Sequence, residues 1–208
     1  MLEPIKHVLN SQRIVLASTS PRRQEILSSI GLNFEICGSR YEENLDPSQF
    51  PDPSHFVLET AYNKVMEVVD RLKTDSRPPD LIIGADTVVS LDGKIFGKPK
   101  TKENAFQTLE KLSGRPHTVY TGIILVKKDK VVKFCESTKV YFGHLTPEII
   151  SGYVKTGEPM DKAGGYGIQG LGGSLIEKIE GDYYTVMGLP LHSLCKHILS
   201  LYKDAEVS

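Results

Sequence analysis

The segment that decides the fold is residues 14–23, which read IVLASTSPRR. Its first four residues are apolar, as in a short strand that is buried on both faces of a sheet. Ser20 followed by Pro21 is typical of the cap and first turn of a helix, and Gly31 is typical of the position just beyond a helix end. The segment therefore predicts a strand that passes directly into a helix, which is the basic unit of an α/β fold.

Further strands and helices follow this unit. Apolar periodicity predicts helices over residues 54–72, 102–112, 146–154 and 189–202, and strands over residues 34–37, 81–83, 118–126, 131–142 and 174–179. Asp92 and Gly93 predict a hairpin turn between short strands at 88–91 and 94–96. Because hairpins interrupt the alternation, we expect a mixed, twisted sheet with helices on its faces, and two lobes around a central cleft.

The composition is that of an ordinary globular protein. Of 208 residues, 39% are hydrophobic and 25% charged, and we expect residues 1–203 to form one domain and 204–208 a disordered tail. The net charge of −1 gives no general attraction to nucleic acid or to an anionic membrane, so neither is an expected partner. No apolar run is long enough to span a membrane. The cysteines have no paired spacing, and we expect a reducing, cytoplasmic setting.

A first candidate site lies where the first strand meets its helix. Ser18, neighbouring hydroxyls, free backbone N–H groups and the guanidinium groups of Arg22 and Arg23 gather there. Two cations at a helix N-terminus oppose the helix dipole by about 0.3–1 kcal/mol each unless an anion compensates them. Arginine offers a planar fork that matches phosphate oxygens. The segment predicts a phosphate site, and the alternative is a capped helix with two surface arginines.

A second candidate site follows the strand at 81–83. Asp86, within the stretch GADT at 84–87, is expected just beyond the strand's carboxyl end, where open α/β sheets bind ligands. It is a candidate metal ligand, general base or both, and the alternative is an Asx turn that leads into the hairpin. Lys98 follows the hairpin and could reach back to neutralise a phosphate, the alternative being a solvated lysine of a turn.

Two more charged residues are candidates. Lys64 lies beside the predicted apolar face of helix 54–72, on the line of Ala61 and Val68. The predicted face itself is formed by Leu58, Tyr62, Val65, Val69 and Leu72. Partial burial beside that face would favour a role for Lys64 over a fully solvated position. Glu43 opens an acidic loop with Glu42 and could offer a carboxylate to a hard cation near Asp86, the alternative being a solvated charge pair.

The segment at 158–173 is unusually rich in glycine, which makes up six of its last ten residues. Because such a segment loses much entropy on ordering, it predicts a close approach of backbone to a ligand. The alternative is a plain flexible loop. The embedded Gln169 carries both a donor and an acceptor group.

Together these segments resemble the Maf family, the septum-formation-inhibitor or house-cleaning nucleotide pyrophosphatases. The matching motifs occur in one order over nearly the whole chain. They are LASTSPRR at 16–23, GADTVV at 84–89, GKP at 97–99, LSG at 112–114, HTVYTG at 117–122 and EPMDKAGGYGIQG at 158–170.

The resemblance implies a nucleotide cleft and the hydrolysis of dTTP- and UTP-type triphosphates, modified ones included, to monophosphate and pyrophosphate. It implies a divalent metal (Mg²⁺, Mn²⁺ or Co²⁺) held by Asp86 and Glu43. The family's catalytic residues fall on Asp86, Lys64 and Lys98. Its substrate-binding residues fall on Ser18, Arg22, Arg23, Thr87 and Gln169, of which Arg22, Thr87 and Gln169 are linked to base preference.

The resemblance also implies a homodimer, and that such a domain can be joined to a C-terminal methyltransferase-like region, of which this sequence contains nothing. Three alternatives to the predicted activity stay open. One is a phosphatase that releases orthophosphate, and another is a nucleotide-binding regulatory domain with weak or lost turnover. The third is a 7-methyl-GTP-type pyrophosphatase, which fits less well because the chain has no Trp to stack on a cationic base.

Overall fold

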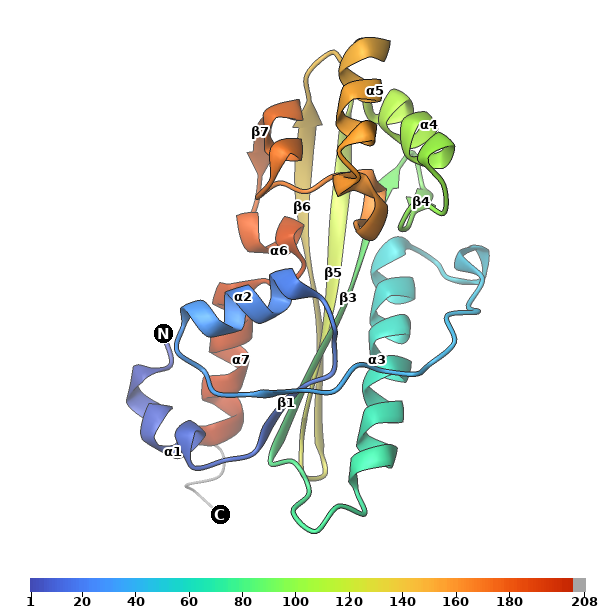
Figure 1. The fold of residues 1–208 in the computed structure, drawn as a ribbon. Helices are drawn as coiled ribbons and strands as arrows, with labels where there is room; N and C mark the ends of the chain where they lie inside the picture. Colours follow the sequence, from blue (N-terminus) through green and yellow to red (C-terminus); the bar gives the residue numbers. More distant parts are fainter. Residues whose placement is uncertain (204–208) are drawn as a thin grey trace.

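The computed structural model describes residues 1–203, and the predicted tail at 204–208 lies outside these described residues. A seven-stranded mixed sheet with helices on its faces forms the structure, as the sequence predicts (Figure 1). The strands are β1 (Ile14–Leu16), β2 (Glu35–Ile36), β3 (Leu81–Leu91), β4 (Lys94–Phe96), β5 (Pro116–Lys127), β6 (Lys130–Phe142) and β7 (Ile176–Glu180). The helices are α1 (Lys6–Asn10), α2 (Pro21–Ser29), α3 (Pro53–Leu72), α4 (Lys102–Leu112), α5 (Pro147–Lys155), α6 (Tyr183–Met187) and α7 (Leu191–Lys203). None of these helices is long and apolar enough to cross a membrane.

The sheet combines a short parallel part with a long antiparallel part. Its strand order is β2-β1-β3-β5-β6-β7, and β4 pairs with β3 beside this path. β1 runs parallel to β2 and β3, whereas the other pairs are antiparallel. Asp92 (φ 51°) and Gly93 (φ 75°) form the turn between β3 and β4, so the predicted hairpin is confirmed.

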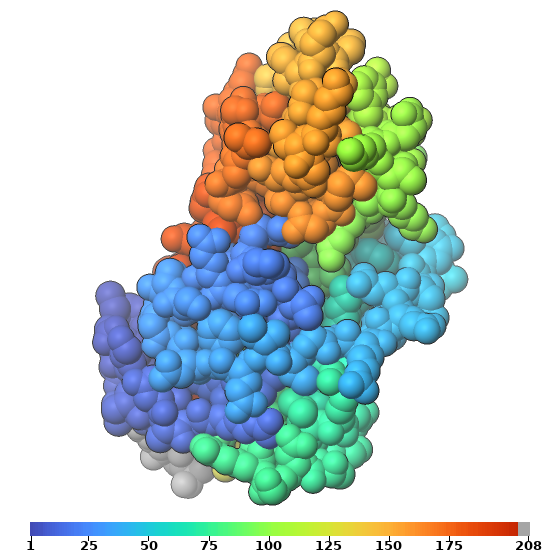
Figure 2. Space-filling model, viewed as in Figure 1, coloured from blue at the N-terminus to red at the C-terminus, as the bar shows by residue number. Residues whose placement is uncertain are grey.

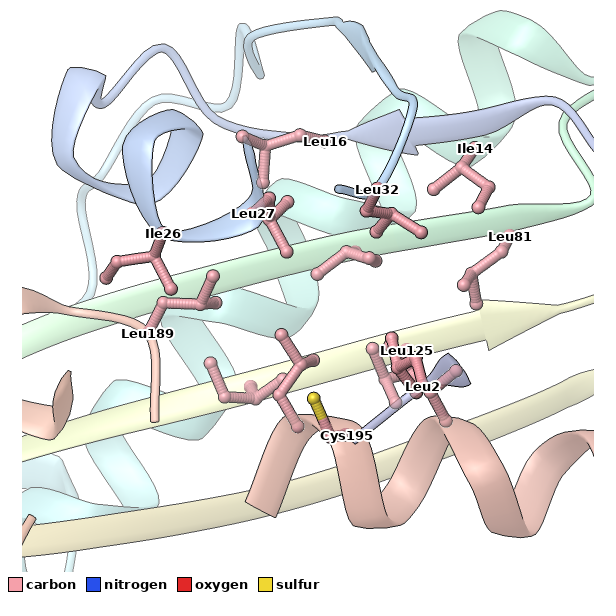
Figure 3. Close-up of a cluster of buried hydrophobic side chains, with 14 of the residues drawn as sticks. Leu2, Ile14, Leu16, Ile26, Leu27, Leu32, Leu81, Leu125, Leu189 and Cys195 are labelled. Atoms are coloured by element: carbon pink, nitrogen blue, oxygen red, sulfur yellow. The ribbon is translucent and has the colours of Figure 1, made fainter. Parts of the chain in front are cut away.

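The hydrophobic core explains the division into two lobes. At one end of the sheet, α2 and α7 pack over β1, β3 and β5 on one face, and Figure 3 shows their side chains meeting there. On the opposite face of the same end, α3 packs against β1, β3 and β5. At the other end, α4 and α5 pack over the far halves of β3, β5 and β6. The two lobes therefore share the long strands, which run from one to the other (Figure 1).

Strand β3 is longer than the sequence predicts, and this changes the position of Asp86. The strand does not end before Gly84 but continues to Leu91, with Asp86 paired opposite Gly122 of β5. Asp86 therefore lies inside a strand, and both its predicted place beyond the strand end and the Asx-turn alternative are wrong. Gly84 suggested a strand end, but it is a glycine because Val65 of α3 packs directly against it.

The buried face of α3 is also displaced from the predicted one. Val57, Ala61, Val65 and Val68 are fully buried, whereas Leu58, Tyr62, Val69 and Leu72 are only partly buried at the edge of the cluster. Ala61 and Val68, on whose line the sequence places Lys64, thus belong to the buried face instead of lying beside it. The helix approaches the sheet closely, since a Cβ at Gly122 would lie 3.0 Å from the carbonyl oxygen of Val57.

Helix α2 begins where the sequence predicts, but for a partly different reason. Ser20 occupies the N-cap position, yet its side chain accepts no capping hydrogen bond. Instead, Ser18 Oγ accepts a hydrogen bond from the Ser20 N–H at 3.2 Å. Gly31 follows the helix with φ 67°, as expected of a residue beyond a helix end. The short helices α1 and α6 were not predicted, because five residues are too few to show periodicity.

The contact between Gly84 and Val65 gives a test of how closely α3 packs on the sheet. Gly84→Ala places a Cβ against Val65 and is expected to destabilise the protein by about 1–3 kcal/mol. Val65→Ala makes room for this Cβ. The loss of unfolding free energy in the double variant is therefore expected to be at least about 1 kcal/mol smaller than the sum of the losses in the two single variants. Urea unfolding measures both.

Gly152→Ala is the matched control, because Gly152 lies in α5 with no atom within 4 Å of an added Cβ. It is expected to be neutral or to stabilise by about 0.5–1 kcal/mol. Additive effects of Gly84→Ala and Val65→Ala would show that the helix does not depend on this contact.

Candidate active site

A cleft of about 280 Å³ lies between the two lobes and is lined by all nine predicted site residues. They are Ser18, Arg22, Arg23, Glu43, Lys64, Asp86, Thr87, Lys98 and Gln169. The walls come from the start of α2 on one side and the glycine-rich segment on the other. In Figure 2 these are the blue and orange segments that meet across the middle of the molecule.

The cleft lies at a gap in the edge of the sheet. β1 pairs with β3 only as far as Ile83, and β4 begins to pair on the same side of β3 only at Val89. Between these points no strand of the described chain covers that edge of β3. Because side chains alternate along a strand, Asp86 and Thr87 point to opposite faces, yet both line the cleft at this open edge.

Asp86 is joined to a second carboxylate through one lysine. Lys64 Nζ lies 2.7 Å from Asp86 Oδ1 and 2.7 Å from Glu43 Oε1. The Asp86 side chain is only 13% exposed. Burial raises the pKa of Asp86, although Lys64 and Arg23 oppose this shift. A raised pKa suits a carboxylate that has to accept a proton from water.

Arg23 is a buried cation held by neutral oxygens. Its Nε donates to the carbonyl oxygen of Gly188 at 2.8 Å, and its terminal nitrogens donate to Ser18 Oγ at 3.0 Å and Thr87 Oγ1 at 3.1 Å. Burial lowers the pKa of Arg23 to about 10, partly offset by Asp86, so the guanidinium remains charged near neutral pH. Its charge is not neutralised by a bonded carboxylate within residues 1–203, which leaves it able to attract an anion.

Arg22 behaves differently from its neighbour. Its NH1 pairs with Asp161 Oδ2 at 2.9 Å, and its NH2 donates to the Asp161 carbonyl oxygen at 3.2 Å. This contact connects α2 to the glycine-rich segment across the cleft. The first alternative, two surface arginines on a capped helix, is therefore wrong, because both side chains line the cleft and make long-range contacts.

Lys98 and Gln169 reach the cleft from other directions. Lys98 comes directly after the β3–β4 hairpin, and Gln169 lies near the end of the glycine-rich segment. Both are exposed residues at the rim. The structure thus brings them to the other site residues, and their exposure leaves their polar groups accessible to a ligand.

The glycine-rich segment is folded rather than a plain flexible loop. It forms 3₁₀ turns at Glu158–Asp161, Ala163–Gly165 and Leu171–Leu175. Glu158 accepts hydrogen bonds from Tyr153 Oη at 2.8 Å and from the N–H groups of Leu171 at 2.9 Å and Gly172 at 3.0 Å. Tyr166 Oη lies 2.8 Å from His117 Nε2, which fixes the middle of the segment to β5.

The glycines of this segment are needed for packing, which the sequence did not predict. Gly164 has φ 68°, and a Cβ there would lie 2.6 Å from Val89 Cγ2. A Cβ at Gly167 would lie 2.6 Å from Lys162 Cε, and one at Gly170 would lie 2.6 Å from Glu158 Oε2. These glycines therefore allow close packing of the protein on itself, and Gly167 also lines the cleft, where close approach to a ligand stays a prediction.

The sequence did not single out Asp161 and Lys162, which also line the cleft. Lys162 Nζ lies 2.6 Å from Asp161 Oδ1 and donates to the carbonyl oxygen of Glu158 at 2.8 Å. The signal that could have found them is their position as adjacent opposite charges inside a glycine-rich segment. Periodicity gave no indication of which way their side chains point.

The carboxylates offer only part of a metal site. Among residues 1–203, no group of three or more His, Cys, Asp or Glu residues is arranged to hold a metal ion. Asp86 and Glu43 converge on one point, where Lys64 Nζ joins them. Two carboxylates fit a hard divalent cation such as Mg²⁺ if substrate phosphates and water supply its other ligands, which is how Mg²⁺ is usually bound.

Comparison with known proteins relates the chain to one family. The family model described as "Maf-like protein" matches residues 13–201. A human protein named "Probable bifunctional dTTP/UTP pyrophosphatase/methyltransferase protein" is 48% identical over 97% of this chain, which covers 34% of the human protein. Proteins named "dTTP/UTP pyrophosphatase" from Thermoanaerobacter sp. and Clostridium perfringens are 49% and 48% identical over 88% of this chain, and the matches cover 93% and 94% of their lengths.

His117, which anchors the glycine-rich segment, provides a pH test. Burial lowers the pKa of His117 to about 4, whereas an unfolded histidine titrates near 6.5. As pH falls from 6.5 toward 4, the unfolded state therefore binds more protons and the folded state loses stability. When the pH is lowered from 7 to 5, the free energy of unfolding of the wild type is expected to fall by about 2 kcal/mol more than that of His117→Gln, as measured by urea unfolding.

His7→Gln is the matched control, because it removes an exposed imidazole from α1. The free energy of unfolding of this variant is expected to depend on pH as that of the wild type does. If that of His117→Gln also depends on pH in this way, His117 is not held neutral by burial.

Proposed function

The chain belongs to the Maf-like protein family, and we propose that it is a nucleoside triphosphate pyrophosphatase. Its substrates are nucleotides of the dTTP and UTP type, modified ones included, and its products are the monophosphate and pyrophosphate. The observation that carries the proposal is the cleft itself. Its charged lining residues are five cations and three carboxylates, one of them the nearly buried Asp86, and this excess of positive charge suits a polyanion.

The proposal includes a divalent cation, Mg²⁺, Mn²⁺ or Co²⁺, bound by Asp86 and Glu43. When bound, it supplies neutralisation of the triphosphate charge and a preferred orientation for water. The convergence of both carboxylates on Lys64 Nζ supports this assignment. Phosphoryl transfer depends mostly on such positioning and charge neutralisation, and the protein needs to provide little covalent chemistry.

In this reaction, a water molecule attacks the α-phosphorus and Asp86 accepts its proton. The bond between the α-phosphorus and the oxygen that bridges to the β-phosphorus breaks, and pyrophosphate leaves. Lys64 and Lys98 stabilise the charge that develops on the leaving group. Arg23, with its uncompensated charge, and Arg22 bind the phosphates, while Ser18 holds Arg23 in place.

Base preference is assigned to Arg22, Thr87 and Gln169. Gln169 is exposed at the rim, where its amide can meet a base edge. Thr87 accepts a hydrogen bond from Arg23 and lies 3.0 Å from Thr121 Oγ1, so its contribution includes the placement of Arg23. The chain has no Trp, the best face for a cationic methylated base, which favours the dTTP and UTP type over the 7-methyl-GTP type.

The proposal also covers the setting of the protein. We propose that the protein is a homodimer and that it works in a reducing, cytoplasmic environment. The free thiols of Cys37, Cys135 and Cys195 support the reducing environment. The chain spans about a third of the human relative, whose name includes a methyltransferase. Fusion to a methyltransferase-like region therefore remains part of the proposal. Light scattering of the purified protein tests the dimer.

The proposed role of Asp86 is tested by Asp86→Asn. The variant is expected to lose about 10²–10⁴-fold in kcat, the usual contribution of general-base catalysis, while it still binds nucleotide. Pyrophosphate release is measured from a panel of nucleoside triphosphates with Mg²⁺ or Mn²⁺, and EDTA is expected to abolish it. Asp70→Asn is the matched control, because Asp70 forms an exposed pair with Lys73 on the same helix as Lys64.

Near-normal turnover by Asp86→Asn would contradict the assigned role. Release of orthophosphate by the wild type would indicate a phosphatase instead. Binding of nucleotide by the wild type without any turnover would favour a regulatory domain.

The role of Gln169 is tested by Gln169→Ala. The variant is expected to show a flatter preference among bases, because an alanine cannot pair with a base edge. The ratio of kcat/KM for dTTP to that for dATP, dGTP and dCTP measures the preference, and an unchanged ratio removes Gln169 from base recognition. Gln107→Ala is the control, since Gln107 bonds only to Glu103 on the exposed side of α4.

A further inference from the structure

Two cations from opposite walls of the cleft converge on a single carboxylate. Arg22 comes from α2, and Lys162 comes from the glycine-rich segment of the other lobe. Arg22 NH1 lies 2.9 Å from Asp161 Oδ2, and Lys162 Nζ lies 2.6 Å from Asp161 Oδ1. The two positive charges thus meet one negative charge, and each of its oxygens takes one of them.

The cations are sheltered, whereas the carboxylate is not. The side chains of Arg22 and Lys162 are 18% and 12% exposed, but that of Asp161 is 58% exposed. Ion pairs with an exposed partner contribute little, on the order of 0–1 kcal/mol, because water screens them. Asp161 can therefore leave its two partners at small energetic cost, and the cations that remain would attract another anion.

Lys162 is held in place by contacts that do not involve Asp161. Its Nζ donates to the carbonyl oxygen of Glu158 at 2.8 Å. Its aliphatic stem lies against Gly167, where a Cβ would come within 2.6 Å of Lys162 Cε and 2.8 Å of Cδ. Gly167 thus leaves space for the lysine stem, and the ammonium stays at the cleft when Asp161 moves away.

We propose that Arg22 and Lys162 form a phosphate-binding pair across the cleft, and that Asp161 occupies this pair as an internal competitor when the cleft is empty. A phosphate group presents two oxygens to two donors much as a carboxylate does. An incoming triphosphate replaces Asp161, and Asp161 returns to both cations as the product leaves. The inference extends the proposed function, since it adds Lys162 and Asp161 to the triphosphate site.

Binding of inorganic tripolyphosphate in the presence of Mg²⁺, measured by titration calorimetry on the full chain, tests the pair without base or turnover. Lys162→Met is expected to weaken binding at least tenfold, because one of the two cations is lost. Asp161→Asn is expected to tighten binding about three- to tenfold, because the competitor loses its charge. In the Lys162→Met background, Asp161→Asn is expected to raise the affinity for tripolyphosphate by a smaller factor, whose logarithm is at most half of that in the wild-type background.

The last comparison separates direct competition from general electrostatics, because a distant charge would act equally in both backgrounds. Asp92→Asn is the matched control: Asp92 also forms an ion pair with an arginine, Arg115, at 2.7 Å, but on the exposed β3–β4 hairpin. It is expected to leave binding unchanged. Lys162→Gln is the second variant if Lys162→Met lowers the melting temperature.

The inference is overturned if the wild type does not bind tripolyphosphate, if both Lys162 variants bind it within twofold of the wild type, or if Asp161→Asn weakens binding. Wild-type turnover of dTTP is measured in parallel. If the variants change tripolyphosphate binding as expected but the wild type releases no pyrophosphate from dTTP, the phosphate pair is supported and the proposed function is contradicted. If the wild type turns over dTTP but the variants bind tripolyphosphate as the wild type does, the proposed function is supported and the phosphate pair is contradicted.

Discussion

Helix α3 lies against β3 and β5 at two glycines, Gly84 and Gly122, and the geometry of the cleft depends on this contact. Without side chains at these positions, the helix backbone comes close enough for Lys64 to reach from the buried face of α3 to Asp86 in the middle of β3. The same lysine then holds Glu43, which belongs to an exposed loop. A larger residue at either glycine would move the helix away from the sheet and separate this cation from both carboxylates.

The gap in the sheet edge has an equally direct effect on the chemistry. Since β1 ends its pairing at Ile83 and β4 starts only at Val89, the middle of β3 is open on one side. Asp86 and Thr87 point to opposite faces there. The same strand therefore places Asp86 next to Lys64 on the α3 side and Thr87 next to Arg23 on the α2 side. The charges of the cleft are thus divided between two faces. Arg23 keeps a full charge on one face, while the carboxylates share Lys64 on the other.

The local parts of the fold could be predicted because their signals lie within short stretches of sequence. The strand-to-helix unit at 14–31, the β3–β4 hairpin and helix α4 at 102–112 all occur where periodicity and turn residues indicated. The length of β3 and the buried face of α3 could not be predicted in the same way. Both depend on the partner that packs against them, and a glycine inside a strand is identical in sequence to a glycine at its end. Seven of the nine site residues lie in the quoted motifs, whereas Lys64 was found beside the predicted apolar face of its helix and Glu43 in an acidic loop, and all nine line one cleft.

The sequence by itself determined which chemical groups are present and in which order: the hydroxyls and arginines at 18–23, the acid at 86, the lysines at 64 and 98 and the glycines at 164–173. Only the tertiary structure decided their pairing. It left Arg23 among neutral oxygens while Arg22, its neighbour, pairs with Asp161 from 139 residues further along the chain. It also brought Lys162 into the cleft and gave the glycines a packing role. The physical reason is that ion pairs and burial depend on distance in space, which strand register and helix packing set and which spacing along the chain does not.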